Sequence, residues 1–441
     1  MSSAVISEQT PIAILGAGLT GMSAALELRE RGAPHRIFEK LNAPGGHAVT
    51  IEDNGFRFDR TGHLLHLKSD ALRAQVLDWI GPDHLRIQRR SVIWSNGVYT
   101  RYPFQANTYG LPPQVAYECV QGFIAAHFAP PGRAEPNNFE EYCEQHFGEG
   151  ISRHFMIPYN SRLWGVHPRE ITSAWCQRFV PLPRLEDVIA GAVGLNDREL
   201  GYNSNFIYPR LGIGQLTKGM ASRLPELELG RAPLRIELGA RCLVFADERL
   251  KFDVLLSTIP LPQLLGLIDD VPDEVRAAAA KLRCSHLDYL DVALRRKPGT
   301  DFHWAYVPEA KYPFYRVGCY SNFSDALAPP GKSSLYVELA SRSPPDLDRV
   351  LPEVARGLIE MGVIDSADDI EFARARRIDY AYVIFDHQYF AALEVIRPFL
   401  EGARIVSSGR YGDWNYSAME DAIAFGKTAA ERALALRRDA T

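Results

Sequence analysis

The chain has 441 residues, too many for one simple domain and enough for two or three domains with sizeable cores. Hydrophobic residues make up 46% and charged residues 23%, as is usual for a globular protein. The net charge of −5 gives no electrostatic reason to expect nucleic acid or an anionic membrane as a partner. An anionic ligand would have to be held by local arginines.

The cysteines and the apolar segments indicate the cellular compartment of the protein. The six cysteines are Cys119, Cys143, Cys176, Cys242, Cys284 and Cys319. They form neither a C-x-x-C pair nor a cluster with histidine, which fits a reducing compartment and predicts no metal site. The N-terminus lacks a basic segment followed by an apolar core, and the most apolar stretch, 254–268, is short and contains two prolines. We therefore expect no signal peptide, no membrane span and a cytoplasmic protein.

The start of the chain predicts a β-α-β unit. Residues 11–16 (PIAILG) form an apolar run that ends in glycine and is typical of a buried parallel strand. Residues 21–32 have the apolar spacing of a helix that ends at glycine, and residues 35–40 predict the next strand.

Along the rest of the chain, the predicted secondary structure changes from mainly helical to mainly strand. Residues 100–185 are rich in aromatics and helical patterns, with the clearest helix at 138–148, and predict a mainly helical insertion. Strand patterns return over 232–260, and the β-rich segments 286–322 and 334–340 indicate a second sheet. A helix at 347–362 and a closing strand and helix complete the pattern.

The motif GAGLTG lies between the first strand and the first helix. Gly16 permits the tight turn, Gly18 lets the backbone approach a pyrophosphate, and Gly21 lets the helix pack close to the strand. Glu39 ends the second strand where the ribose hydroxyls would lie, and Lys40 follows it. Together these features predict a dinucleotide site; the alternative is a glycine-rich turn in an ordinary α/β domain.

Three further segments favour FAD over NAD. Gly45 and Gly46 give a second close backbone approach, as a flavin cofactor requires. Residues 253–260 (DVLLSTIP) resemble the late strand that lies at the adenine side in flavoproteins. The segment SSGRYGDWNYSAMED (407–421) is where such proteins bring a glycine turn and a helix back to the flavin.

Several motifs together resemble those of the UDP-galactopyranose mutase family, within the wider amine oxidase and protoporphyrinogen oxidase group of FAD proteins. The motifs cover most of the chain: GFRFDRTGHLLHL (55–67), RYPFQANTYGLP (101–112), FMIPYNSRLWGVHPREIT (155–172), GYNSNFIYPRLGIGQL (201–216), FYRVGCYSNFS (314–324) and GRYGDWNYSAMED (409–421).

The resemblance implies an isomerase reaction. In the family, N5 of the reduced flavin attacks the anomeric carbon of a nucleotide sugar and displaces the nucleoside diphosphate. The sugar ring opens, recloses as a five-membered ring and is rejoined to the diphosphate, with no net redox change. Reduced nicotinamide, NADPH or NADH, is the implied reductant.

The resemblance also implies the roles of individual residues. Arg410 and Tyr416 would bind the diphosphate from the closing motif, Arg316 would bind it from the opposite sheet, and Tyr382 from segment 380–386. Arginine suits this task because it is always charged and can bind oxygens in pairs. The sugar and nucleotide pocket would contain Gln105, Asn160, Trp164, Asn203 and Phe206.

A second set of residues would face the flavin. His63 would lie beside N5, so the residues implied as catalytic are His63, Arg316 and Arg410. The cofactor-binding set would be Gly16, Gly18, Gly21, Glu39, Lys40, Gly45, Gly46, His63, Gly409, Met419, Glu420 and Asp421. The positive end of the helix that starts near residues 419–421 would suit an anionic reduced flavin.

These patterns predict an α/β fold with a Rossmann-type FAD-binding domain, a helical insertion domain and an antiparallel β-sheet domain. The FAD-binding domain is expected to comprise 1–100, 201–285 and 386–441, the helical substrate domain 101–200, and the sheet domain 286–385. A nucleotide sugar is the expected partner, and a homo-oligomer is compatible with the sequence.

The chain departs from the family pattern beside the flavin and in its closing motif. Arg60 and Thr61 stand where a small residue or glycine is commoner, and Glu420 and Asp421 stand where the family often has an amide. The sugar and the nucleotide therefore stay open. Two other functions also stay open: an FAD-dependent oxidase or desaturase with an apolar tunnel, and a catalytically inactive protein that binds a nucleotide sugar. Asp59 and Asp413 are expected to be turn or surface acids.

Overall fold

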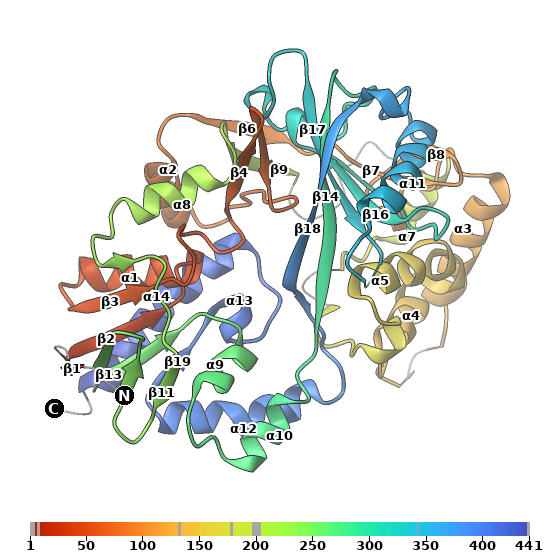
Figure 1. Ribbon diagram of the computed structural model, residues 1–441. Coiled ribbons are helices and arrows are strands. Elements are labelled where there is room, and N and C mark those ends of the chain that lie inside the picture. Colours follow the sequence, from red (N-terminus) through yellow and green to blue (C-terminus); the bar gives the residue numbers. More distant parts are fainter. Residues whose placement is uncertain are drawn as a thin grey trace.

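Two large sheets organise the chain and lie beside each other in Figure 1. The computed structural model describes residues 5–6, 9–130, 134–176, 180–195, 204–341 and 343–438. Among these residues, none of the helices combines the length and the apolar character needed to cross a membrane.

The first sheet has eight strands, and its centre is parallel. Its strands are β1 (Val5–Ile6), β2 (Thr10–Leu15), β3 (His35–Phe38), β10 (Leu227–Glu228), β11 (Arg235–Glu237), β12 (Cys242–Val244), β13 (Glu248–Ser257) and β19 (Ile405–Ser407). Leu15 pairs with Phe38 and with Ser257, and Ser257 pairs with Ser407. The carboxyl ends of four parallel strands therefore meet at one edge, and the segments that follow them are brought together.

Helices α1 (Leu19–Glu30) and α14 (Met419–Arg438) lie side by side against the parallel sheet, as Figure 1 shows. They approach so closely that a Cβ atom on Gly426 would lie 2.3 Å from the Thr20 carbonyl oxygen. The Ser23 hydroxyl also donates to the Ile423 carbonyl at 2.7 Å. This contact fixes the start of α14 next to the glycine-rich turn that begins α1.

The second sheet has seven strands in the order β18-β14-β17-β16-β15-β7-β8. Its strands are β7 (Ser91–Ser95), β8 (Val98–Arg101), β14 (Cys284–Leu294), β15 (Trp304–Tyr306), β16 (Phe314–Cys319), β17 (Ser333–Leu339) and β18 (Ile370–Val383). All neighbours are antiparallel except β15 and β7, which are parallel. The long strands β14 and β18 face the parallel sheet (Figure 1).

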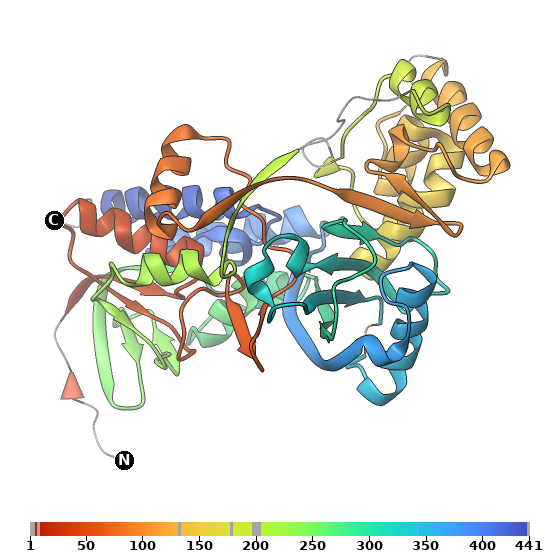
Figure 2. The ribbon, with the colours of Figure 1, turned by 90° about the horizontal axis from the view of Figure 1, so that it is seen from above.

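A group of helices lies beyond the second sheet, away from the parallel sheet, as Figure 2 shows. It consists of α3 (Pro113–His127), α4 (Phe139–Ile151), the π-helical turn Ser152–Met156, α5 (Ile157–Trp164) and α7 (Leu185–Ala192). Glycines let α3 and α4 touch, because a Cβ atom on Gly148 would lie 2.0 Å from the Gly122 carbonyl oxygen.

Smaller elements complete the chain. They are the hairpin β4 (Thr50–Asp53) and β5 (Phe56–Asp59), the pair β6 (His84–Gln88) and β9 (Asn205–Pro209), and the helices α2 (Asp70–Ile80), α8 (Gly214–Ala221), α9 (Leu261–Leu267), α10 (Asp273–Ala279), α11 (Leu347–Glu360) and α12 (Tyr389–Gly402).

The predicted α/β class, with a Rossmann-type parallel sheet and a separate antiparallel sheet, is confirmed. The predicted division into domains stays a prediction. In the structure β7 and β8 pair within the second sheet, whereas the predicted division places residues up to 100 with the parallel sheet. Both strands are short and carry no sequence signal for the sheet they join.

Candidate active site

The glycine-rich turn after β2 has the geometry that the motif predicts. Gly16 has a φ of +95°, which residues other than glycine rarely adopt, and Gly18 is the N-cap of α1. A Cβ atom on Gly21 would lie 1.9 Å from the Gly16 carbonyl oxygen. The turn therefore exposes backbone at the start of a helix, where anions bind.

Glu39 is buried at the end of β3 and supports this turn. Its Oε2 accepts a hydrogen bond from the Ala17 backbone N–H at 2.9 Å, and its Oε1 accepts one from the Leu41 N–H at 2.9 Å. The neighbouring Lys40 side chain is exposed. The carboxylate thus holds the turn in shape from the position predicted for ribose binding.

Gly45 and Gly46 lie against the same turn. The Gly45 N–H donates to the Ala17 carbonyl at 2.8 Å, and Gly18 and Gly45 form a parallel bridge. Both glycines have positive φ, +120° and +61°, and a Cβ atom on Gly46 would lie 3.3 Å from the Gly18 Cα. The two loops form a cradle without side chains, which suits the close approach of a diphosphate.

The closing motif folds into the one-turn helix α13 (Gly409–Gly412) after β19. Gly409 has a φ of +91°, and a Cβ atom there would lie 2.6 Å from the Thr20 Oγ1. The Asp413 carboxylate accepts from the Gly409 N–H at 2.9 Å and from the Ser408 hydroxyl at 3.2 Å. Asp413 therefore fixes this turn and is not a surface acid.

Helix α14 begins at Met419, and its first acids bind backbone groups. Glu420 Oε1 accepts from the N–H groups of Lys68 and Ser69, both at 2.8 Å. Asp421 Oδ2 accepts from the Ala418 N–H at 2.8 Å. The predicted contact of this segment with a cofactor would accordingly rest on its backbone.

Arg410 extends from α13 into a group of aromatic rings. Its guanidinium donates to the carbonyls of Ser417 at 2.7 Å and Ala381 at 2.9 Å. The guanidinium carbon lies 4.6 Å from the centre of the Tyr416 ring and 5.8 Å from that of Tyr382. The described residues give Arg410 no carboxylate within ion-pair distance, so its charge is not neutralised by the protein at close range.

Arg316 reaches the same rings from β16 in the second sheet. Its Nη2 donates to the Tyr382 hydroxyl at 3.2 Å and pairs with the fully buried Glu338 carboxylate at 2.6 Å. Burial raises the pKa of the Tyr382 phenol, which therefore stays protonated and able to donate. Trp164 packs edge-on against Tyr382, and their ring centres lie 5.6 Å apart.

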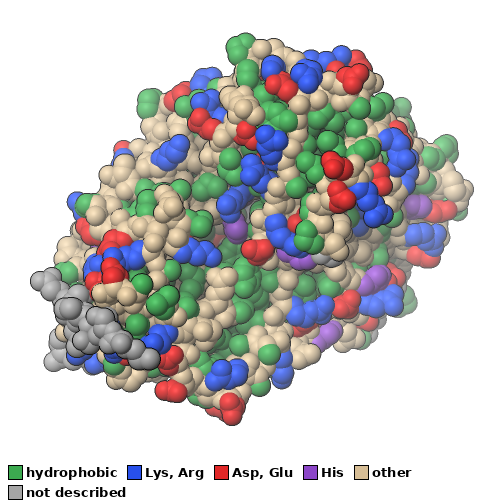
Figure 3. Space-filling view, viewed as in Figure 1, with side chains coloured by type: hydrophobic (Ala, Val, Ile, Leu, Met, Phe, Trp, Pro, Cys, Tyr) green, Lys and Arg blue, Asp and Glu red, His purple; other side chains and the backbone are tan. Residues whose placement is uncertain are grey.

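These five residues form what we call the arginine–tyrosine cluster: Trp164, Arg316, Tyr382, Arg410 and Tyr416. All five come from the motifs on which the site prediction rests. In the space-filling view, Lys, Arg and His side chains gather near the middle of the face between the two sheets (Figure 3).

Tyrosines that the site prediction does not include adjoin this cluster. Tyr102 stacks on Tyr306 at 5.2 Å, and Tyr159 meets Tyr306 edge-on at 5.3 Å. The Arg89 guanidinium lies 4.9 Å from the Tyr102 ring. Tyr102 and Tyr159 belong to the motif segments at 101–112 and 155–172, so their aromatic character was an available signal.

Other predicted pocket residues make local contacts of their own, and their role in the pocket stays a prediction. The amide of Gln105 donates to the Pro181 carbonyl at 2.9 Å, and the amide of Asn160 donates to the Met156 carbonyl at 2.7 Å. Both side chains are buried and stabilise local backbone in the helical part. Phe206 packs in β9 against Phe323, with ring centres 6.0 Å apart. Asn203 lies outside the described residues.

His63 lies near Arg410 and Arg60 and is held neutral. Burial is the largest cause that lowers its pKa, to about 4, and the two arginines lower it further. Nearby His47 has its pKa lowered to about 3, again chiefly by burial. Its ring meets Tyr411 edge-on at 5.4 Å. Arg60, His47 and Tyr411 were not among the predicted site residues.

Several buried polar atoms in this region have no hydrogen-bond partner among the described residues. They are His63 Nδ1, Trp164 Nε1, Arg316 Nε and Ser417 Oγ. Buried polar groups are normally paired, so these four atoms are available to hydrogen-bond a polar ligand.

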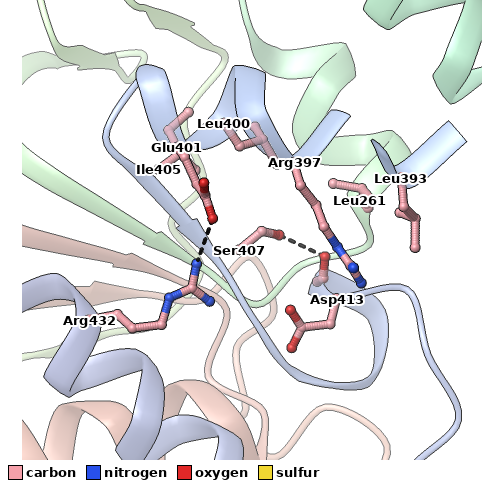
Figure 4. Close-up of a pocket in the computed structure, with 10 residues that line it drawn as sticks. Leu261, Leu393, Arg397, Leu400, Glu401, Ile405, Ser407, Asp413 and Arg432 are labelled. Atoms are coloured by element: carbon pink, nitrogen blue, oxygen red, sulfur yellow. Dashed lines mark hydrogen bonds and ion pairs between the residues drawn. The ribbon is translucent and has the colours of Figure 1, made fainter. Parts of the chain in front are cut away.

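A separate hollow of about 340 Å³ lies behind α13 (Figure 4). Its wall includes Asp413, Arg397 from α12 and Arg432 from α14. Arg432 also pairs with Glu401 at 3.6 Å. Its wall includes neither Arg410 nor Tyr416. This hollow is therefore distinct from the arginine–tyrosine cluster.

Comparisons with known proteins agree with this geometry. Residues 14–78 match the family model described as NAD(P)-binding Rossmann-like domain. The crystal structure of reduced UDP-galactopyranose mutase superposes with a TM-score of 0.90 and 29% identity, over 97% of this chain and 96% of that chain.

More distant relatives share only part of the sequence or only the fold. Phytoene desaturase (lycopene-forming) from Pantoea ananas is 41% identical over 49 residues, which is 11% of this chain and 10% of the relative. The chain thus matches about a tenth of the length of that relative. Putrescine oxidase bound to putrescine superposes with a TM-score of 0.67 at 14% identity, over 97% of this chain and 99% of that chain, which shows a common fold. The predicted resemblance to the UDP-galactopyranose mutases, within the wider amine oxidase-like group, is therefore confirmed over nearly the whole chain.

Proposed function

We propose that the chain is a reduced-FAD-dependent mutase that interconverts the pyranose and furanose forms of a nucleotide sugar such as UDP-galactopyranose. The observation that carries this proposal is the convergence of two arginines on Tyr382: Arg316 from β16 of the second sheet and Arg410 from α13, which follows β19 of the parallel sheet. Two guanidinium groups among tyrosine hydroxyls suit a diphosphate, which must be held while it is detached from the sugar.

The cofactor fits the cradle at the edge of the parallel sheet. Gly18 and Gly46 face each other without side chains, and the start of α1 offers unpaired N–H groups to a diphosphate. Gly409 and the first turn of α14 would approach the flavin ring. When bound and reduced, by NADPH or NADH, the flavin would supply the nucleophile and the electrons for the reaction.

The two arginines would have different tasks. Arg316 is already paired with Glu338, so it would act mainly by orienting the Tyr382 hydroxyl and by offering its unpaired Nε. Among the described residues, Arg410 contacts carbonyl oxygens and aromatic rings and no carboxylate, so its charge would act on the anionic ligand. Arg410 would therefore contribute more to diphosphate binding.

His63 would serve as a neutral hydrogen-bonding group beside the flavin. Its lowered pKa keeps the imidazole uncharged at neutral pH, so one ring nitrogen can donate and the other can accept. His63 Nδ1 is buried and without a partner among the described residues, and a bound ligand would satisfy it.

An FAD-dependent desaturase or oxidase is the second candidate, because a 49-residue match is to a desaturase. That match spans only 11% of this chain. The arginine–tyrosine cluster favours the mutase, since an apolar substrate would leave the charge of Arg410 without an anionic partner.

The test uses purified protein reduced with dithionite under anaerobic conditions and incubated with a panel of UDP-hexoses and other NDP-hexoses. We expect ring-contracted product, detected by chromatography, from at least one of these sugars. Arg410→Ala should lower the rate by about a hundredfold, as does the loss of one charge-stabilising donor in other enzymes.

Arg397→Ala is the matched control, because Arg397 lines the hollow behind the same turn. It should keep the wild-type rate. Absence of conversion for every nucleotide sugar, with flavin reduction by an amine or a polyene, would overturn the mutase in favour of the second candidate.

A further inference from the structure

Arg60 lies where three segments of the predicted cofactor site meet. Its Nη1 lies 3.4 Å from His47 Nδ1, and His47 directly follows the Gly45–Gly46 pair. The His47 ring in turn contacts Tyr411 in α13. One arginine thus joins the second glycine loop, the loop that carries His63, and the closing turn.

The charge of Arg60 is not balanced by an ion pair. Among the described residues, no carboxylate lies within ion-pair distance of its guanidinium. Arg60 interacts electrostatically with the Asp291 carboxylate in β14, but that carboxylate is bound by Arg376 Nε at 3.0 Å. His47 and His63 are uncharged at neutral pH because burial lowers their pKa values, and Arg410 is a second cation that acts on both histidines.

The backbone fixes the direction of Arg60. Thr61, the next residue, has a φ of +65°, a left-handed conformation that costs a threonine about 1 kcal/mol or more. Asp59, the preceding residue, is buried and anchored by the Thr50 and Tyr208 hydroxyls. Arg60 is therefore placed between a strained residue and an anchored one, at a position where the family pattern has a small residue.

We propose that Arg60, held by His47, is a positioning charge that favours the reduced, anionic form of the bound flavin. Reduction by a nicotinamide transfers a hydride, two electrons and one proton, and leaves the flavin with one negative charge. A fixed cation in a site shielded from water stabilises that charge and so raises the reduction potential. The inference rests on FAD being the cofactor of the proposed function.

The test measures the reduction potential of the bound flavin by anaerobic equilibration with a reference dye. Arg60→Gln should lower the ratio of reduced to oxidised flavin at least tenfold at a given potential, which is a shift of about 30 mV for a two-electron couple. Arg60→Lys should restore most of this loss because it keeps the charge. Arg57→Gln, on the adjacent strand β5 and paired with Glu52, is the control and should leave the potential unchanged.

Each outcome separates this inference from the proposed function. An unchanged potential in Arg60→Gln, with FAD bound and the mutase reaction intact, would overturn the inference alone. If the reduction potential fell equally in Arg60→Gln and Arg60→Lys, the arginine would act through its packing, and the proposed role of its charge would be overturned. A protein that binds no FAD at all would overturn both.

Discussion

Asp59 is a buried carboxylate whose hydrogen bonds connect three parts of the molecule. It accepts from the hydroxyls of Thr50 and Tyr208, at 2.6 and 2.5 Å, and from the Ile213 N–H at 3.1 Å. Burial raises its pKa to about 7, although these hydrogen bonds act in the opposite direction. The expectation that Asp59 is a turn or surface acid is wrong. The spacing of apolar residues and the composition of the segment do not show that other parts of the chain bury this strand end.

The raised pKa makes stability depend on pH. Between about pH 4 and pH 7 the folded state binds the Asp59 proton more tightly than the unfolded state does. The free energy of unfolding that this proton contributes is therefore lost as pH rises. The loss is on the order of 4 kcal/mol for three pKa units.

Asp59→Asn should flatten this dependence, since an amide carries no titrating proton. Denaturant unfolding at pH 5 and pH 8 measures it, with Asp83→Asn, in an exposed ion pair with Arg210, as the control. If Asp59→Asn lost as much stability as the wild type over this range, the assignment of the effect to Asp59 would be wrong.

At the scale of elements, helix α14 caps a helix far away in the sequence. Glu420 accepts the N–H groups of Lys68 and Ser69, and Ser69 is the N-cap of α2. The start of α14, predicted to face the flavin, is thereby tied to the start of α2. A pattern of i, i+3 and i, i+4 positions predicts each helix but not the carboxylate that joins them.

Glu420→Ala removes the acceptor of both N–H groups, a loss of about 1–3 kcal/mol for two hydrogen bonds of about 0.5–1.5 kcal/mol each. Amide hydrogen exchange in the first turn of α2 should become about tenfold faster or more, while the rest of the parallel sheet stays protected. Glu431→Ala, on the same helix and in an exposed pair with Arg31, serves as the control. Unchanged exchange at residues 68–72 would show that the contact does not hold α2.

The elements themselves were largely predictable. The β-α-β start, the helix at 138–148 and the closing strand and helix follow from apolar spacing, since burial dictates that spacing. The one-turn helix α13 was missed, because four residues are too few for a periodic signal. The membership of β7 and β8 in the second sheet depends on long-range pairing, which local patterns do not contain.

At the scale of the whole molecule, the two sheets each bring one arginine to the same tyrosine. Arg316, Tyr382 and Arg410 could be predicted because enough of their motifs is recognisable in the sequence. The hydrogen bonds of Gln105 and Asn160 to nearby carbonyls could not, since an amide gives no sign of its partner. Arg60 was visible only as a departure from a pattern, and His47 was not singled out at all, until the fold brought them together.

The central claim is that the flavin acts in its reduced state without net oxidation, while the two arginines hold the detached diphosphate. The most direct measurement incubates oxidised and dithionite-reduced protein with UDP-galactopyranose and follows the sugar ring and the flavin spectrum together. We predict furanose product only with the reduced protein, and a flavin that is still reduced at the end. Product from the oxidised protein, or flavin reoxidised in proportion to product, would contradict the account.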